Sequence, residues 1–351
     1  MGQYWFTIAM ECREKWIGQT GSKLGEWFWD WEVMGLARLL KRPHWADDIS
    51  CTAQWSRLDH GYLPTTSTGA SAPRRAKGIL SLPVELVNAV FDNLDDLLDV
   101  LNMCLAHKFL GAIGEPLAHK LIAEEYAPWA KQKIICIGNN LLDSDLPAGL
   151  ERYVAQDIRD LIDHTEDDEH DGDEDDDQLF GTAIDKYGKR GGALWHGVLH
   201  MLWPAGALTR ADRRKVAQLA RKLDVVERKP YASSNVEDSQ LVLFNLSKQK
   251  YVRQASVQGL HERLVEPEAF PGKAIDLGQV LLSHICWSSD DGCAMAVDSK
   301  RLTRGPWAGD HFEVMYAGQS RGRLDSEEWT DVTDDTVAWL EELWRDTWRG
   351  T

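Results

Sequence analysis

The chain has 351 residues, of which 43% are hydrophobic and 27% are charged, a balance typical of a water-soluble globular protein. Its formal net charge of -17 disfavours non-specific binding to nucleic acid or anionic membranes, because phosphate groups would be repelled. The six cysteines form no C-x-x-C pair, and no apolar run reaches the roughly 20 residues of a membrane span, so disulfide scaffolds, zinc knuckles and membrane insertion are disfavoured.

The first 60 residues predict a strand followed by a helix. Aromatic and β-branched residues favour an extended segment from Gln3 to Ile17, with Tyr4, Phe6 and Ile8 on one face. Apolar residues then recur at helical spacing over residues 26–40. We expect this segment to be the N-terminal part of an α+β domain.

Residues 61–78 predict a linker, because their Ser, Thr and Gly residues cannot bury enough apolar surface to offset the entropy of ordering. The segment that follows has the spacing of a helix. Its apolar residues Leu82, Leu86, Val90 and Leu94 step by four and predict one buried stripe.

Two further helices are expected after this stripe. Asp95 and Asp96 favour a helix start, and the glycines Gly111 and Gly114 predict a break before a third helix over residues 115–126. Three short helices bury little surface alone, so part of their apolar surface is expected to be available to a partner.

The remainder of the chain predicts strands and helices without βαβ repetition, which favours an α+β fold. Residues 279–287 fit both periods, and a strand is favoured there. A solvated acidic loop is expected at about 164–178. The other predicted elements are strands at 133–137, 241–246, 251–256 and 307–316, and helices at 150–162, 210–223 and 332–344.

The stretch from Ile79 to Ile122 resembles an F-box, whose family pattern is a Leu-Pro-x-Glu start followed by apolar positions in three helices. The start is matched by Leu82, Pro83, Glu85 and Leu86. The later family positions are matched by Phe91, Leu94, Leu97, Leu98, Leu101, Cys104 and Phe109. Where many family members carry Leu-Trp in the third helix, this chain has Glu115, Pro116 and Leu117 and lacks the large anchor.

This resemblance implies binding to a Skp-type adaptor of a cullin-RING ubiquitin ligase, with the rest of the chain presenting a protein substrate. Buried leucine anchors would contribute about 1.5 to 3 kcal/mol each. The implied partner-binding residues are Leu82, Pro83, Glu85, Leu86, Phe91, Leu94, Leu98 and Leu101. The alternative interpretation of the same pattern is an ordinary helical hairpin in a larger core.

The chain also resembles a family of uncharacterised basidiomycete fungal proteins that open Met-Gly-Gln-Tyr-Trp, as Met1 to Trp5 do. Further matches are Lys23 to Glu26, Lys133 to Gly138, Asn245 to Arg253, Ile285 to Asp290 and Trp307 to Asp310. If these motifs belong to one domain, the F-box and the acidic run are insertions into a single discontinuous unit. A split into two domains at residue 125 is the alternative.

Groups that could carry chemistry are few. His196 and His200 have the spacing of two zinc ligands on a helix, but Gly197 stands where the general base of a metalloprotease would be, and packed histidines are favoured. Cys286, His284 and Asp290 are too close on a predicted strand to be assumed to converge. No dinucleotide, P-loop or nucleophile-elbow motif occurs, so neither a cofactor nor a metal is expected.

We therefore expect four parts: residues 1–60, a linker at 61–78, an F-box at 79–122, and residues 123–351 as the C-terminal part of the α+β domain. The protein is expected to be cytoplasmic or nuclear, without enzymatic activity, and to bind a Skp-type adaptor and a protein substrate. Trp287, Trp307 and Asp310 are candidates for a substrate surface, because amphipathic rings favour interfaces. An interaction or ligand-binding domain with purely structural helices is the second hypothesis, and an enzyme is the third.

Overall fold

The computed structural model describes residues 4–16, 22–42, 78–153, 178–190, 236–266, 268–292 and 299–348. These residues fall into two compact units. The sheet unit contains the described residues before 42 together with those after 128, and the three-helix unit contains residues 78–128. Both helices and strands are present, so the predicted α+β class is confirmed.

The sheet unit is built on ten described strands, in the order β10-β7-β6-β9-β4-β1-β2-β5, with β3 paired to β1 and β8 paired to β4. Most neighbours are antiparallel, and three pairs are parallel. The strands are β1 (Tyr4–Ala9), β2 (Glu14–Trp16), β3 (Ser22–Lys23), β4 (Lys133–Gly138), β5 (Gly188–Arg190), β6 (Leu241–Asn245), β7 (Lys250–Arg253), β8 (Cys286–Trp287), β9 (Asp310–Tyr316) and β10 (Thr330–Asp331).

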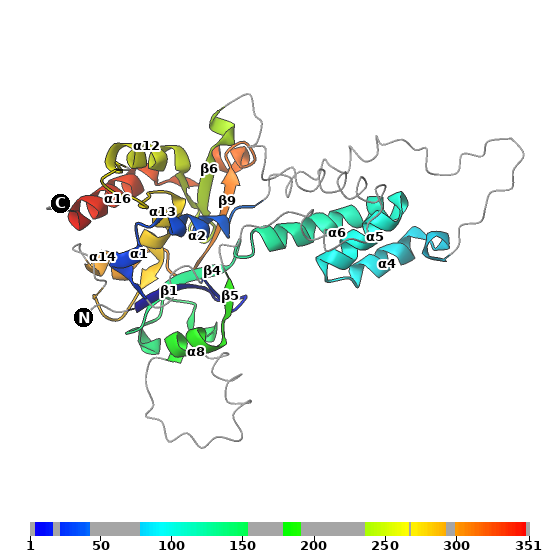
Figure 1. Ribbon diagram of the computed structural model, residues 1–351, viewed down its shortest axis with the longest axis horizontal. Coiled ribbons are helices and arrows are strands. Elements are labelled where there is room, and N and C mark those ends of the chain that lie inside the picture. The colour runs from blue at the N-terminus through cyan, green and yellow to red at the C-terminus, as the bar shows by residue number, and fades with distance from the viewer. Residues whose placement is uncertain are drawn as a thin grey trace, which may run out of the picture. The chain divides into compact units, whose positions relative to one another are not determined.

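Helices cover both faces of this sheet (Figure 1). Residues of α2, α12, α13 and α16 join the core on one face, and residues of α8 join the core on the other. The helices of the unit are α1 (Leu24–Trp27), α2 (Met34–Arg38), α8 (Gln178–Lys186), α12 (Gln254–Leu264), α13 (Leu277–Ile285), α14 (Ser299–Thr303), α15 (Arg321–Leu324) and α16 (Thr333–Thr347), with 3-10 turns η1 (Trp31–Val33), η3 (Asp143–Asp145) and η4 (Glu237–Ser239).

Strand β1 lies inside the sheet and is buried on both faces. Phe6 and Ile8 belong to the core on one side, whereas Trp5 and Ala9 belong to the core on the other. The single strand predicted from Gln3 to Ile17 is wrong, because the chain turns back after Ala9 and returns as β2. Arg13 adopts a φ of 51° in this turn.

The long helix predicted over residues 26–40 is also interrupted. Asp30 is extended and forms a bridge with Lys273, and the backbone amide of Trp31 donates to Gly272 O. These tertiary hydrogen bonds replace the helical ones between Trp27 and Trp31, so α1, η1 and α2 form instead of one helix.

The strand favoured over residues 279–287 is wrong for most of its length, because α13 occupies Leu277–Ile285. Asp276 caps this helix by accepting from Gly278 N at 2.7 Å, while Gln279 Oε1 accepts from Asp276 N at 3.0 Å. This reciprocal capping box starts a helix regardless of the ambiguous apolar pattern that follows. Only Cys286 and Trp287 are extended, as β8.

Tryptophan side chains form much of the sheet unit's core. Eight of them are buried there: Trp5, Trp16, Trp27, Trp29, Trp129, Trp307, Trp339 and Trp344. Trp29 meets Trp344 edge to face, with ring centroids 5.0 Å apart. Most of the tryptophans in the described residues therefore contribute to core packing.

Four other predicted elements of the sheet unit are confirmed. Strands β4, β6 and β9 and the closing helix α16 lie where the sequence predicts them. The strand predicted over residues 251–256 ends earlier, at Arg253, because α12 begins at Gln254. The helix predicted over residues 150–162 lies beyond the described residues after Tyr153.

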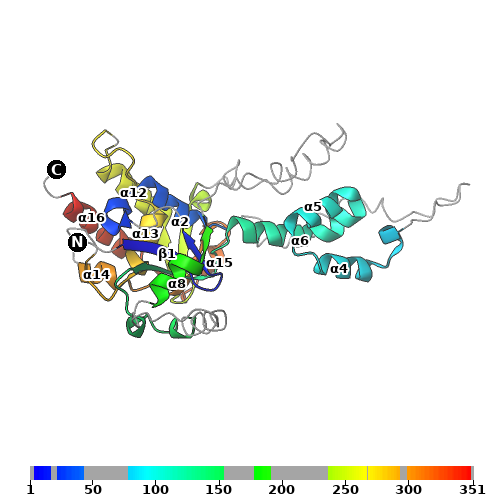
Figure 2. The ribbon, with the colours of Figure 1, turned by 60° about the horizontal axis from the view of Figure 1, so that its bottom comes forward.

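The three-helix unit consists of the 3-10 turn η2 (Gly78–Ser81) and the helices α4 (Val84–Asp92), α5 (Leu97–Ala106) and α6 (Lys108–Tyr126). Helix α6 packs along α5 and also contacts α4 (Figure 2). The predicted break at Gly111 and Gly114 is wrong, because both glycines lie inside α6.

Several predicted segments lie outside the described residues. They are the linker up to residue 77, the acidic loop up to residue 177, the pair His196 and His200, and the basic helix at 210–223.

Candidate docking surface on the three-helix unit

The three helices are held together by their own apolar core. Phe91 is 3% exposed and packs with Val87, Leu101 and Cys104. Gly114 allows α6 to approach this core closely, since a Cβ at that position would lie 2.3 Å from the Phe91 ring and 2.6 Å from Cys104 Sγ. The glycine therefore serves helix packing here and does not end the helix.

Four aliphatic side chains on and just before α4 remain outside this core. The exposed fraction is 38% for Leu82, 44% for Val84, 52% for Leu86 and 38% for Val90. Together with Pro83, which is also exposed, we call these residues the α4 surface. The predicted buried stripe through Leu82, Leu86 and Val90 is thus wrong, because α4 turns Val87 and Phe91 inward instead.

Local hydrogen bonds fix the start of the α4 surface. Ser81 Oγ donates to Gly78 O at 2.7 Å, and Leu82 N donates to Ile79 O at 3.2 Å. Pro83 follows in an extended conformation as the N-cap residue of α4, where a proline loses no helical hydrogen bond. Leu82 is therefore presented by a short closed turn.

The start of α5 is fixed by a side-chain cap. Asp96 Oδ1 accepts from Leu98 N at 2.7 Å and from Asp99 N at 3.0 Å. A carboxylate at this position satisfies two amides that the first turn leaves without a partner. The start of α5 is therefore set by Asp96, one of the two aspartates that favour a helix start in the sequence.

The eight residues implied by the F-box resemblance divide into three groups in the structure. Leu82, Pro83, Glu85 and Leu86 are exposed, and Leu94 and Leu98 are half-buried. Phe91 and Leu101 are buried in the unit's core, so they hold the helices together and offer no surface to a partner. Val84 and Val90 are also exposed, although the resemblance does not include them among the partner-binding residues. The helical period that places Val87 and Phe91 inward would have identified Val90 as a surface residue.

Buried titratable groups of this unit are not suited to catalysis. Burial, and to a smaller extent Glu115, raises the pKa of the Cys104 thiol to about 12, so the thiol is protonated and a poor nucleophile. Burial lowers the pKa of His119 to about 4. His119 Nε2 lies 3.6 Å from Glu115 Oε1 on the same helix.

In the sheet unit, the three residues expected to form a substrate surface have different environments. Trp307 is 3% exposed and stacks on His284, with ring centroids 4.1 Å apart, so its ring is not available to a partner. Asp310 accepts from Asn245 Nδ2 at 2.8 Å and pairs with Lys248 Nζ at 3.2 Å. Its carboxylate is thus engaged within the unit.

Trp287 is half-buried. Its indole Nε1 donates to Asp145 O at 2.6 Å, and the Arg304 guanidinium lies 4.9 Å from its ring centroid. Arg304 also donates to Asp145 Oδ2 at 2.6 Å, and this hydrogen bond helps to lower the pKa of Asp145. These contacts hold the Trp287 ring in place at the edge of the core.

The hydrogen bonds of His284 and Asp290 in the structure lead to other groups and do not join the two side chains to each other. His284 Nδ1 lies 2.9 Å from Val280 O and 2.8 Å from Ser283 Oγ. Asp290 accepts from Asn140 Nδ2 at 2.9 Å and from Gly292 N at 2.9 Å. Burial lowers the pKa of His284 to about 4, which keeps its imidazole neutral at pH 7.

A polar chain that the sequence did not indicate joins three distant segments. Glu11 Oε1 lies 3.2 Å from His311 Nε2, and Ser247 Oγ lies 3.2 Å from His311 Nδ1. Ser247 Oγ also accepts from His311 N at 2.9 Å, so this hydroxyl fixes the β6–β7 turn against β9. Such a contact across 300 residues leaves no signal in local spacing.

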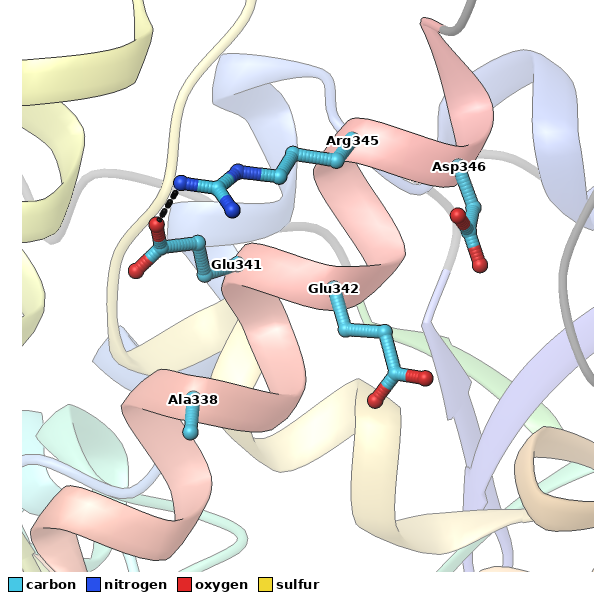
Figure 3. A pocket seen from close by; sticks show the side chains of 5 residues that line it. All are labelled: Ala338, Glu341, Glu342, Arg345 and Asp346. Atoms are coloured by element: carbon cyan, nitrogen blue, oxygen red, sulfur yellow. Dashed lines mark hydrogen bonds and ion pairs between the residues drawn. The ribbon is translucent and has the colours of Figure 1, made fainter.

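A depression follows the outer face of α16 and is lined by Ala338, Glu341, Glu342, Arg345 and Asp346 (Figure 3). All five residues belong to one helix. Glu341 pairs with Arg345 and accepts from Arg263 at 3.0 Å. Its carboxylate is therefore neutralised locally, and the depression has little of the enclosed apolar lining that ligand sites share.

Within the described part of the chain, every helix is too short or too polar to span a membrane. The same residues contain no cluster of three His, Cys, Asp or Glu side chains that could hold a metal ion.

The geometry thus defines a mixed α+β protein that carries a compact three-helix unit with an exposed aliphatic surface. No family model matches the chain. No curated protein and no solved structure matches it either.

Proposed function

We propose that the chain is an F-box substrate-recognition adaptor, which binds a Skp-type adaptor of a cullin-RING ubiquitin ligase through the α4 surface. The observation that carries this proposal is the exposure of Leu82, Val84, Leu86 and Val90 on a unit whose core is complete without them. Leu86 and Val90, four residues apart, lie in one row on α4, and an exposed aliphatic row of this kind is typical of helix-face docking.

The position of the surface in the sequence supports the same function. The Leu-Pro-x-Glu start of the F-box resemblance is Leu82 to Glu85, and these residues form the turn and first residues of α4 that present the surface. The sheet unit would then select the protein to be ubiquitinated. Its substrate surface is proposed around Trp287, which is one of the three residues predicted for that role and is half-buried, whereas Trp307 is buried.

Binding to a purified fungal Skp-type adaptor tests this function directly. The variant is Leu82→Ala with Leu86→Ala in the full chain, and the matched control is Leu142→Ala with Ile184→Ala, two exposed aliphatic residues of the sheet unit. About half of each leucine is already covered, so each truncation removes about 1 kcal/mol of binding free energy and the double variant binds at least about tenfold more weakly.

Isothermal titration calorimetry gives the affinities, and circular dichroism checks that both variants keep the helical content of the unchanged chain. The control variant is expected to bind as the unchanged chain does. If the unchanged chain fails to bind the adaptor, the proposed function is wrong and the helices are structural.

A further inference from the structure

The α4 surface is bordered by carboxylates, and this segment of the chain contains no cation. Residues 78–107 include five acidic residues and neither Lys nor Arg. The five are Glu85, Asp92, Asp95, Asp96 and Asp99, all of them exposed. Among the described residues, none of the ion pairs involves any of them.

Two of these carboxylates lie on α4 itself, to one side of the exposed Leu86. Glu85 and Asp92 are seven residues apart, which is close to two turns, so they lie on one side of α4. The buried pair Val87 and Phe91 lies on another side, and Leu86 is about 100° from its neighbours Glu85 and Val87, one in each row. Leu86 is therefore placed between the core and a line of negative charge.

Helix stability explains only part of this charge. Asp96 caps α5, and Glu85 and Asp99 lie in the first turns of their helices, where the helix dipole favours a carboxylate. Asp92 is the last residue of α4, where the dipole disfavours one. A contribution to binding accounts for an acidic residue at a position where it lowers the stability of its own helix.

We infer that the partner of the α4 surface presents an apolar groove bordered by lysine or arginine side chains, and that the carboxylates beside α4 attract it electrostatically. This inference rests on the proposed function and adds the charge of the partner's surface. A second copy of the chain does not fit as the occupant, because pairing two α4 surfaces would place their acidic borders together. Opposite charges at the rim act mainly on the association rate.

Surface plasmon resonance with an immobilised fungal Skp-type adaptor tests the inference on the full chain, which also carries the cations Arg74, Arg75 and Lys77 ahead of the surface. The test variant combines Glu85→Gln, Asp92→Asn and Asp95→Asn and leaves the Asp96 cap intact. The matched control combines Asp325→Asn, Glu327→Gln and Glu328→Gln, three exposed carboxylates of the sheet unit. Both variants change the net charge equally.

For the unchanged chain, the association rate constant is expected to fall about tenfold between about 0.05 M and about 0.5 M NaCl. The test variant is expected to associate several-fold more slowly at low salt, with a weaker salt dependence and an unchanged dissociation rate constant. The control is expected to behave like the unchanged chain.

Three results would overturn the inference, and they are distinguishable from one another. If the test variant associates as fast as the unchanged chain, or the control slows equally, the border has no specific role while adaptor binding stands. If light scattering shows self-association that Leu86→Ala abolishes, the occupant is a second copy. If no form binds the adaptor at either salt concentration, the proposed function fails together with the inference.

Discussion

Helices α4 and α13 have the same length of nine residues, yet their apolar side chains have opposite environments. In α13 every residue is buried except His284, which is half-buried, because the helix contacts α2, α16 and strand β4. In α4 only Val87 and Phe91 are buried. An aliphatic residue is thus a core residue in one helix and surface in the other, and the number of neighbouring elements decides which.

Because of this difference, buried residues should determine the stability of the fold, whereas exposed ones are the candidates for docking. Truncating a buried side chain loses transfer free energy and leaves a cavity, whereas truncating an exposed one has little effect on folding. The same helix, α4, carries both kinds of residue, so the comparison can be tested inside one element.

The largest expected effect is that of Phe91→Ala. Because Phe91 fills the core between the three helices, its loss should lower the free energy of unfolding of the unit by about 3 to 5 kcal/mol. Leu86→Ala should change it by less than about 0.5 kcal/mol. Urea unfolding followed by far-ultraviolet circular dichroism measures both, and comparable losses for the two variants would contradict the assignment of inner and outer faces.

A smaller loss of stability is expected from replacing two glycines, one in each unit, against which neighbouring atoms pack closely. A Cβ on Gly305 would lie 2.3 Å from His284 O, a backbone atom, whereas a Cβ on Gly114 would meet the Phe91 ring and the Cys104 thiol. Side chains can shift more easily than backbone, so Gly305→Ala should cost more than Gly114→Ala, within a range of about 1 to 3 kcal/mol. Adding Phe91→Leu should partly restore the Gly114→Ala variant, and the absence of any such rescue would count against the contact.

The smallest effect is a pH dependence in the sheet unit. Burial lowers the pKa of His284 to about 4 from an ordinary value of 6.5, so below pH 6.5 the unfolded chain takes up a proton that the folded chain does not. The stabilisation by this group is complete above 6.5 and is lost as the pH falls towards 4. Relative to a His284→Gln variant, the unchanged chain should lose about 1 to 2 kcal/mol between pH 7 and pH 5.

The difference between the two curves is the quantity to measure, because Asp276 titrates in the opposite sense. Burial raises the pKa of Asp276 to about 6, so this carboxyl favours the folded state more as the pH falls. Both chains contain Asp276, and its contribution cancels in the comparison. Parallel curves for the two chains would show that His284 is protonated alike in the folded and unfolded states.

The sequence predicted elements whose signals are local. The strands β4, β6 and β9 and the helix α16 follow from their apolar patterns. Helix α13 could have been found from its capping box, Asp276 with Gln279, which the apolar pattern obscured. Gly114 was misread because the close approach of α6 to Phe91 exists only in the folded unit.

The pairing of strands could not be predicted from such local signals. Strand β1 pairs with β4, so that Phe6 lies opposite Ile137, and neither segment encodes the choice of the other. For the docking surface, the sequence identified Leu82 and Leu86 through the F-box resemblance but assigned them to a buried stripe. The inward turn of Val87 and Phe91 depends on where α6 packs, which no single helix determines.

The order of strands in the sheet has a consequence for synthesis of the chain. Strand β9, over Asp310–Tyr316, lies between β6 and β4 and so joins the two halves of the sheet. During synthesis from the N-terminus, β1 and β4 therefore emerge long before the strand that completes their sheet. The three helices at residues 84–126 need only local contacts, which form quickly. The three-helix unit can thus fold during synthesis, whereas the sheet is completed only after almost the entire chain has been made.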